Sequence, residues 1–259
     1  MKSNGGLTEA KWFRGKDSIR SGPAGGIVGA IDVSKLAGFK KIIGFDMGGT
    51  STDVSHFSGS YERTFDTQIS GIRVRAPMMK INTVAAGGGS VLFYDGARFR
   101  VGPDSAGANP GPASYGKGGP LTVTDANIIL GRIQPKFFPK SFGANSDEPL
   151  NYVIVRDKFE ALAAKANLSV SEVAEGFIKI ANENMANAIK KISIQRGYDV
   201  TKYVLTCFGG AASQHACMVA DLLGMEVILI PPLAGVLSAS GIGLAEPRTL
   251  REISFEKPL

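Results

Sequence analysis

The sequence predicts an α/β fold, a mixed β-sheet flanked by helices. An apolar run at residues 42–45 is typical of a buried strand. A capping box formed by Ser169 and Glu172 opens a long helical run that ends at Gly197. Strand and helix patterns then alternate toward the C-terminus, which is typical of a layered α/β architecture. These patterns lie at residues 203–208, 213–223, 227–230 and 235–244.

The N-terminal part is expected to supply one helix and one hairpin. Residues 22–38 begin with Pro23 and close with Gly38, the pairing expected of a helix entry and exit, and small residues along one side imply close packing. The strand at 42–45 then breaks into a glycine turn, and residues 51–58 resume an extended pattern. The sequence therefore predicts a hairpin with a glycine turn.

The middle of the chain is expected to be an inserted, loop-rich region. A second glycine turn lies at residues 87–90, followed by a stretch rich in Gly, Pro, Ser and Ala at 101–120. That stretch is longer than an ordinary connection, which favours a functional or interfacial role. Further strands at 61–77, a helix capped by Thr124 that ends at Gly131, and a polar, proline-punctuated linker at 134–149 complete the expected order.

Composition indicates a globular protein. With 259 residues and 44% hydrophobic content, the chain can bury a large core without disulfide or metal support. No apolar run reaches the about 18 residues of a membrane span, and the first residues lack the features of a secretion signal, so we expect a cytoplasmic protein. The net charge is +6, but its charges are scattered and form no stripe with aromatic residues, which argues against nucleic-acid binding.

Cys207 and Cys217 lie on either side of His215. A reducing cytosol leaves both cysteines as thiols. One imidazole and two distant thiols match no ligand spacing of a zinc module, so a packing role is expected for all three residues.

The segment from Asp46 to Asp53 (DMGGTSTD) carries the strongest chemical signal. Its glycines, Gly48 and Gly49, let backbone N–H groups approach an anion, and the Thr50 hydroxyl can also contact phosphate oxygens. The two carboxylates can orient hydrated Mg²⁺ or an attacking water. The segment is not a Walker loop. By itself, such a turn is also compatible with a purely structural hairpin.

A second glycine pair, Gly209 and Gly210, stands where a predicted strand runs into a helix. Bare backbone at such a point leaves room for a flat ring or a phosphate. Packing of the helix against the strand is the alternative explanation, and the pair alone does not decide between the two.

The order of these pieces resembles the second lobe of the actin, sugar kinase and Hsp70 ATPase superfamily, whose fold is ribonuclease H-like. The resemblance assigns one domain to residues 1–259. It also implies that the first-lobe phosphate loop is missing from this sequence, because nothing before Ser21 is long enough to hold one. The segments called connect 1, phosphate 2, adenosine and connect 2 would be residues 22–38, 46–53, 207–214 and 235–246.

Within that superfamily the chain resembles the hydantoinase A and 5-oxoprolinase family. The matching motifs span almost all of the sequence. Two of them, INTVAAGGGS and CFGGAASQHAC, are closer to 5-oxoprolinases than to N-methylhydantoinases or acetone carboxylase subunits. The motifs are SGPAGG from Ser21, GFDMGGTSTDVS from Gly44, INTVAAGGGS from Ile81, VGPDSAGANPGPASYGKGGP from Val101, TVTDANIILGR from Thr122 and FGGAASQHAC from Phe208.

The resemblance implies ATP-driven hydrolysis of 5-oxo-L-proline to L-glutamate, with ATP and Mg²⁺ as cofactors. It also implies two partners, an N-terminal lobe with its own phosphate loop and a hydantoinase B-type subunit or domain, and an isolated chain that is inactive. The implied site comprises Asp46 and Asp53 as catalytic and metal-binding carboxylates, Gly48, Gly49 and Thr50 at the phosphates, and Gly209, Gly210 and Ala211 at the adenosine.

Three alternatives stay open. The chain could belong to a hydantoin-opening N-methylhydantoinase-type enzyme, to an acetone carboxylase-type ATPase subunit, or to a non-catalytic assembly lobe. Smaller expectations concern single residues outside the two glycine motifs. Gly87 to Ser90 serves either a ligand or packing, Asp104 and Ser105 lie in a loop that could reach an interface or the substrate, Asp125 belongs to a first helical turn, and His56 is packed or at the surface rather than a catalytic base.

Overall fold

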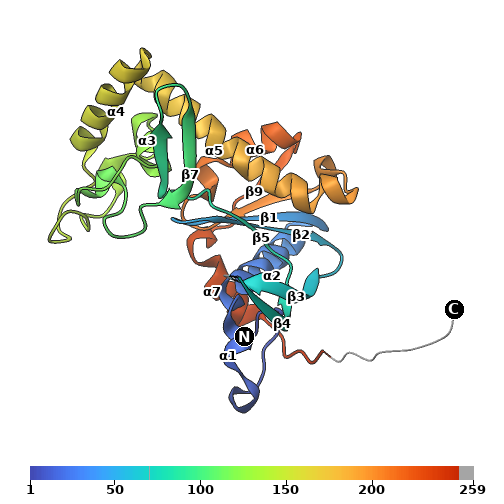
Figure 1. Ribbon diagram of the computed structural model, residues 1–259. Coiled ribbons are helices and arrows are strands. Elements are labelled where there is room, and N and C mark those ends of the chain that lie inside the picture. The colour runs from blue at the N-terminus through green and yellow to red at the C-terminus, as the bar shows by residue number, and fades with distance from the viewer. Residues whose placement is uncertain (70, 251–259) are drawn as a thin grey trace.

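The computed structural model describes residues 1–69 and 71–250, so the end of the predicted domain at 251–259 lies outside the described residues. Its centre is a five-stranded sheet with the order β5-β2-β1-β8-β9. The strand β1 pairs antiparallel with β2 and parallel with β8, so the sheet is mixed, as predicted (Figure 1). The strands are β1 (Lys41–Met47), β2 (Thr52–Ser58), β5 (Asn82–Val84), β8 (Val204–Phe208) and β9 (Val227–Leu229).

Two helices made of small residues cover one face of the sheet. They are α2 (Ser21–Leu36) and α7 (Leu237–Leu244), which cross each other below the sheet in Figure 1. An added Cβ at Gly29 would lie 2.8 Å from the Leu237 carbonyl oxygen, and one at Gly241 would collide with the Gly25 carbonyl oxygen. The backbones therefore touch directly, which confirms the close packing expected of these helices.

The opposite face carries the main core. The helices α5 (Val170–Ile192) and α6 (Ala216–Leu223) lie over it, and α4 (Tyr152–Ala166) packs against α5. The capping box is present, with the Ser169 N–H donating to Glu172 Oε2 at 2.8 Å. Gln195 and its neighbours form a 3₁₀ turn, so α5 ends before the expected Gly197.

The helix α4 was missed from the sequence. Its buried residues, Val155, Phe159 and Ala163, recur every four positions and form one stripe against the core. Asn151 caps its first turn by accepting the Ile154 N–H at 3.0 Å. The apolar stripe and the Asn151 cap are both visible in the sequence, and together they predict this helix.

Two hairpins and a short helix complete the regular structure. The hairpins are β3 (Arg63–Ile69) with β4 (Ile72–Met79) and β6 (Ser90–Tyr94) with β7 (Phe99–Ser105), and the helix is α3 (Val123–Ile129). The expected cap at Thr124 is wrong. Thr122 is the extended residue before the helix, because its N–H and hydroxyl both donate to Asp125.

Residues 134–149 are mostly exposed, as expected of a polar linker, but the segment also packs against the fold. Phe142 and Glu148 form an isolated bridge, and Phe142 packs with the cluster of Ile133 and Leu150. The proline and glycine residues of this segment suggested a linker, so these apolar contacts were not predicted. The short helical segments are α1 (Gly15–Ser18) and 3₁₀ turns at Ala10–Trp12, Ala113–Tyr115, Pro135–Phe137, Ile194–Arg196, Val200–Lys202, Ala212–Gln214 and Ala234–Val236.

The helices that the structure describes include none with both the length and the apolar character needed to span a bilayer.

Candidate functional site

The two glycine motifs meet at one edge of the sheet. The strands β1 and β8 are parallel neighbours, with Asp46 opposite Phe208, so the turns that follow them leave the sheet side by side. The Ala211 N–H donates to the Met47 carbonyl at 3.0 Å and ties one turn to the other. In parallel sheets this edge is where ligands commonly bind.

In the turn after β1, not all backbone N–H groups are used in hydrogen bonds among the described residues. The Gly48 N–H closes the turn on the Ser51 carbonyl at 3.1 Å. Within residues 1–69 and 71–250, the N–H groups of Gly49 and Thr50 donate to no other residue, and both residues are exposed. Successive free N–H groups of this kind form an anion-binding concavity.

The glycine turn at 87–90 supports that first turn. Gly88 N–H donates to the Gly48 carbonyl at 3.0 Å, and the Gly89 N–H donates to the Gly49 carbonyl at 2.6 Å. A Cβ on Gly87 would lie 2.6 Å from the Ser51 nitrogen, so only glycine allows this approach. The packing role left open for this segment is therefore present, and Gly88 also borders a pocket.

That pocket has a volume of about 250 Å³. Both glycine turns line it, and so does the inserted region between Tyr115 and Leu150. Its lining residues are Gly48, Gly49, Gly88, Tyr115, Thr124, Ile133, Phe138, Phe142, Leu150, Gly210, Ala211 and Gln214. The sequence pointed to four of these residues, Gly48, Gly49, Gly210 and Ala211, and left Gly88 open, but it missed the aromatic ones.

Gly209 and Gly210 differ in what surrounds them. Gly209 has a positive φ of 83°, and a Cβ there would collide with Asp46 Oδ1 and the Met47 carbonyl oxygen. Its N–H is already donated to Ala234 at 2.9 Å. Gly210 has open space where a side chain would be. Gly209 thus holds the turn in place, and Gly210 presents bare backbone to the pocket.

Asp46 and Asp53 face each other across the β1–β2 pair. Burial, and then the neighbouring Asp53 charge, raise the pKa of Asp46 to about 6. The Thr83 hydroxyl donates to Asp53 Oδ1 at 2.6 Å. The pair does not line the 250 Å³ pocket; it borders a space of about 10 Å³ beside Pro23.

Two adjacent carboxylates fit a magnesium ion that is held jointly with phosphate oxygens and water, the usual arrangement for that cation. A site built from protein ligands alone does not fit, since the described residues contain no group of three or more His, Cys, Asp or Glu placed for a metal.

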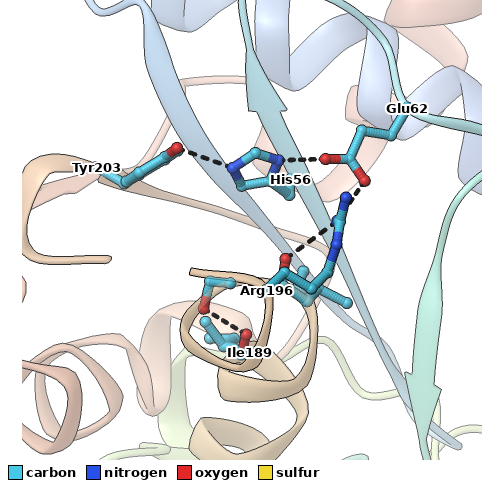
Figure 2. A network of polar contacts seen from close by, with 7 residues as sticks. His56, Glu62, Ile189, Arg196 and Tyr203 are labelled. Atoms are coloured by element: carbon cyan, nitrogen blue, oxygen red, sulfur yellow. Dashed lines mark hydrogen bonds and ion pairs between the residues drawn. The ribbon is translucent and has the colours of Figure 1, made fainter. Parts of the chain in front are cut away.

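His56 is packed, as expected. Its Nδ1 lies 2.7 Å from Glu62 Oε1 and its Nε2 lies 2.9 Å from the Tyr203 hydroxyl, and Arg196 pairs with the same Glu62 (Figure 2). Its ring stacks on Tyr198 at 4.1 Å. Burial lowers the pKa of His56, and the hydrogen bond and charge of Glu62 oppose that shift only in part. The network fastens β2 to the end of α5.

His215 also has both ring nitrogens engaged, on the same face of the sheet, at the start of α6. Its Nδ1 lies 2.7 Å from Asn182 Oδ1, and its Nε2 lies 3.1 Å from Asn127 Nδ2. Burial lowers the pKa of His215 to about 4, so the ring is neutral at pH 7. Cys207 is buried and Cys217 is exposed, and neither forms a disulfide.

Asp125 does more than belong to a first helical turn. Its side chain is fully buried, and it accepts the N–H groups of Ala113 at 3.0 Å and Ser114 at 2.9 Å. The carboxylate thereby fixes the end of the 101–120 segment against α3. Asp104 and Ser105 close β7 and are exposed, so a contact of theirs with substrate stays a prediction.

A mixed sheet with helices on both faces and two glycine turns at one edge defines a lobe of the actin-like type. The model of the family described as hydantoinase/oxoprolinase matches residues 1–251. The chain belongs to that family.

Relatives of known structure and sequence agree with this assignment. The chain is 48% identical to 5-oxoprolinase 1 of Arabidopsis thaliana and 49% identical to the 5-oxoprolinase of Saccharomyces cerevisiae, each over 95% of this chain and 20% of the relative. It therefore spans about a fifth of the length of these relatives.

Two solved structures share the fold. The ATP-dependent caprolactamase from Pseudomonas jessenii matches with a TM-score of 0.82 and 36% identity, over 95% of this chain and 36% of that chain. The nucleotide-free acetone carboxylase matches with a TM-score of 0.82 and 29% identity, over 95% of this chain and 34% of that chain. The predicted actin-like α/β fold is confirmed.

Proposed function

We propose that this chain forms one wall of the nucleotide site in an ATP-dependent hydrolase that opens a small cyclic amide, 5-oxo-L-proline, to give L-glutamate. The observation that carries the proposal is the pair of free N–H groups at Gly49 and Thr50, next to a pocket shared with Gly210. The names of the relatives, 5-oxoprolinase and ATP-dependent caprolactamase, support the reaction class.

The chemistry follows from the stability of a lactam. An amide carbonyl is a poor electrophile, and ATP bound here supplies a phosphoryl group that makes the carbonyl oxygen a leaving group. Water then adds to the same carbon and the C–N bond breaks, which gives an acyl phosphate and a free amine. A second water hydrolyses the acyl phosphate to the carboxylate and inorganic phosphate, with ADP as the other product. The protein contributes mainly position and charge neutralisation.

Each site residue has a role in this proposal. Gly48, Gly49 and Thr50 contact the phosphates through backbone and hydroxyl donors, and Gly210 and Ala211 flank the adenosine. Gly209 acts through the turn that it holds. Asp46 orients Mg²⁺-bound water or the nucleophile, and Asp53, fixed by Thr83, is the second carboxylate near the ion.

The proposal also includes the rest of the enzyme. A further lobe with its own phosphate loop faces this one across the nucleotide, a hydantoinase B-type subunit or domain completes the assembly, and the protein works in the cytoplasm. A non-catalytic assembly lobe is the main competing idea. It predicts no nucleotide binding at the turn after β1.

The test is a substrate panel with the full-length protein. We expect ADP release that depends on 5-oxo-L-proline, with one L-glutamate formed per ADP. ADP release that depends instead on caprolactam, on a hydantoin or on acetone with bicarbonate would reject the assigned substrate. A Gly49→Val variant, which places a side chain among the free donors, is expected to lose ATP binding; unchanged ATP affinity would reject the assigned phosphate site.

A further inference from the structure

The inserted region contributes aromatic side chains to the pocket that the glycine turns also line. Tyr115 and Phe142 form a tilted pair with ring centroids 4.8 Å apart, and Phe138 lies beside them in the lining of the 250 Å³ pocket. Phe138 keeps 43% of its surface exposed although it borders a concave space. An aromatic ring left open in this way can still stack on a flat partner.

The glycine turns contribute bare backbone to the same pocket. Gly210 has no neighbour within 4 Å of an added Cβ, and Ala211 presents only a methyl group. Bare backbone and aromatic rings together line a slot suited to a planar ring. The volume is below the about 300 Å³ of pockets that enclose a drug-sized ligand, so the slot suits one part of a nucleotide.

Gln214 supplies an amide group to this slot. It borders the pocket, and its side-chain amide makes no hydrogen bond in the part of the chain that the structure describes. A glutamine amide offers one donor and one acceptor edge. This combination matches the N7 acceptor and the N6 amino donor of adenine, whereas guanine offers two acceptors on the same edge.

We propose that two residues of this pocket recognise the base: Phe138 of the inserted region stacks on the adenine ring of the nucleotide, and Gln214, in the turn after β8, hydrogen-bonds to its amino edge and sets the preference for adenine. This inference rests on the proposed nucleotide site and adds the residues that recognise the base. The phosphates then extend toward Gly48 and Gly49, which border the same pocket.

The adjacent phenylalanines provide a matched experiment. Phe137 is 75% exposed, does not line the pocket, and has the Lys136 ammonium 4.7 Å from its ring. Titration calorimetry of the full-length protein would compare Mg–ATP, Mg–GTP and Mg–tripolyphosphate for the wild type, Phe138→Ala and Phe137→Ala. Stacking on an aromatic ring contributes about 1–3 kcal/mol per base, so Phe138→Ala should weaken ATP binding by about fivefold to 150-fold and leave tripolyphosphate binding unchanged.

Phe137→Ala should bind all three ligands as the wild type does, and Gln214→Leu should reduce the preference for ATP over GTP. Equal ATP affinity in Phe138→Ala and Phe137→Ala overturns the proposal. Wild-type protein that binds tripolyphosphate as tightly as ATP also overturns it, while leaving the phosphate site intact. Wild-type protein that binds neither ligand rejects the proposed function itself. Phe138→Leu, which keeps apolar bulk but removes the ring, replaces the alanine variant if that variant unfolds.

Discussion

Buried polar residues in this lobe are of two kinds: Asp46 lowers the stability of the fold, whereas others are held by hydrogen bonds. Asp46 is held beside Asp53 in a partly buried place where its ionised form is disfavoured, and no packing contact requires a carboxylate there. Such a cost is typical of groups retained for chemistry. His215 and Asp125 are also buried, yet their hydrogen bonds to neighbouring groups explain them as structural residues.

The variant Asp46→Asn in the full-length enzyme should abolish turnover and leave the fold intact. Asparagine keeps the shape but removes the charge that orients a cation or water. At pH 7 it also removes repulsion from Asp53, and the raised pKa of Asp46 corresponds to a stability gain of up to about 3 kcal/mol. Steady-state ADP release and a thermal melt at pH 7 measure both effects. Retention of most of the activity would refute the assigned role.

His215 should make the lobe sensitive to acid. Its pKa in the folded state is about 4, below the 6.5 of a free imidazole, so the folded protein binds fewer protons than the unfolded chain in this window. Stability is therefore complete above pH 6.5 and falls as the pH drops from about 6.5 toward 4, by up to about 3 kcal/mol in total. His215→Gln keeps one donor and one acceptor without the titration. Its melting temperature should fall less between pH 7 and pH 5 than that of the wild type; an equal fall would exclude His215 as the cause.

At the level of elements, the two turns that follow β1 and β8 depend on one another. The Ala211 N–H bonds to Met47, and Gly209 leaves no room for a side chain against Asp46. The glycine turn at 87–90 supports the first turn from a distant part of the chain. A change in one of these turns is therefore expected to displace its neighbours as well, unless it falls at an open position such as Gly210.

Substitutions at Gly209 and Gly210 should separate effects on the stability of the fold from effects on nucleotide binding. Gly210→Val adds a side chain into open space, so it should leave the melting temperature nearly unchanged and weaken ATP binding in the full-length protein about tenfold or more, because the side chain occupies the ligand slot. Gly209→Val is its control, and it should cost several kcal/mol of stability through its positive φ and its collision with β1. A large loss of stability in Gly210→Val with unchanged nucleotide affinity would show that Gly210 is architectural.

On the scale of the whole molecule, the pocket is bounded by one lobe only. The 259 residues hold a single DxGGTxxD segment, and the chain spans about a fifth of the length of the 5-oxoprolinases that it matches. Phosphoryl transfer needs the γ-phosphate held in line and shielded from water, which requires a second wall.

The isolated 259-residue chain should therefore neither hydrolyse ATP at an enzyme-like rate nor open 5-oxo-L-proline. A coupled ADP assay with and without the lactam measures this, with the full-length protein as reference. Lactam-dependent turnover close to that of the reference would contradict the single-lobe explanation.

The sequence by itself determined the fold class, the small-residue helices and the two glycine motifs. Each of these depends on local features: hydrophobic periodicity, glycine and proline positions, and a capping box. Two local features were nonetheless predicted wrongly: the helix at Tyr152–Ala166 was missed although its apolar stripe and its Asn151 cap are in the sequence, and a cap was put at Thr124 instead of Thr122.

The different roles of Gly209 and Gly210 follow from long-range packing and cannot be inferred from the local sequence. Whether Gly209 or Gly210 has room for a side chain depends on atoms of β1, more than 160 positions earlier in the chain, and no local pattern encodes that distance. The same holds for Phe138, which belongs to the expected linker in the sequence and lines the same pocket as Gly210 in the fold. Sequence patterns specify which residues can bind or pack, whereas the long-range packing of the sheet and the inserted region determines which of them face the same space.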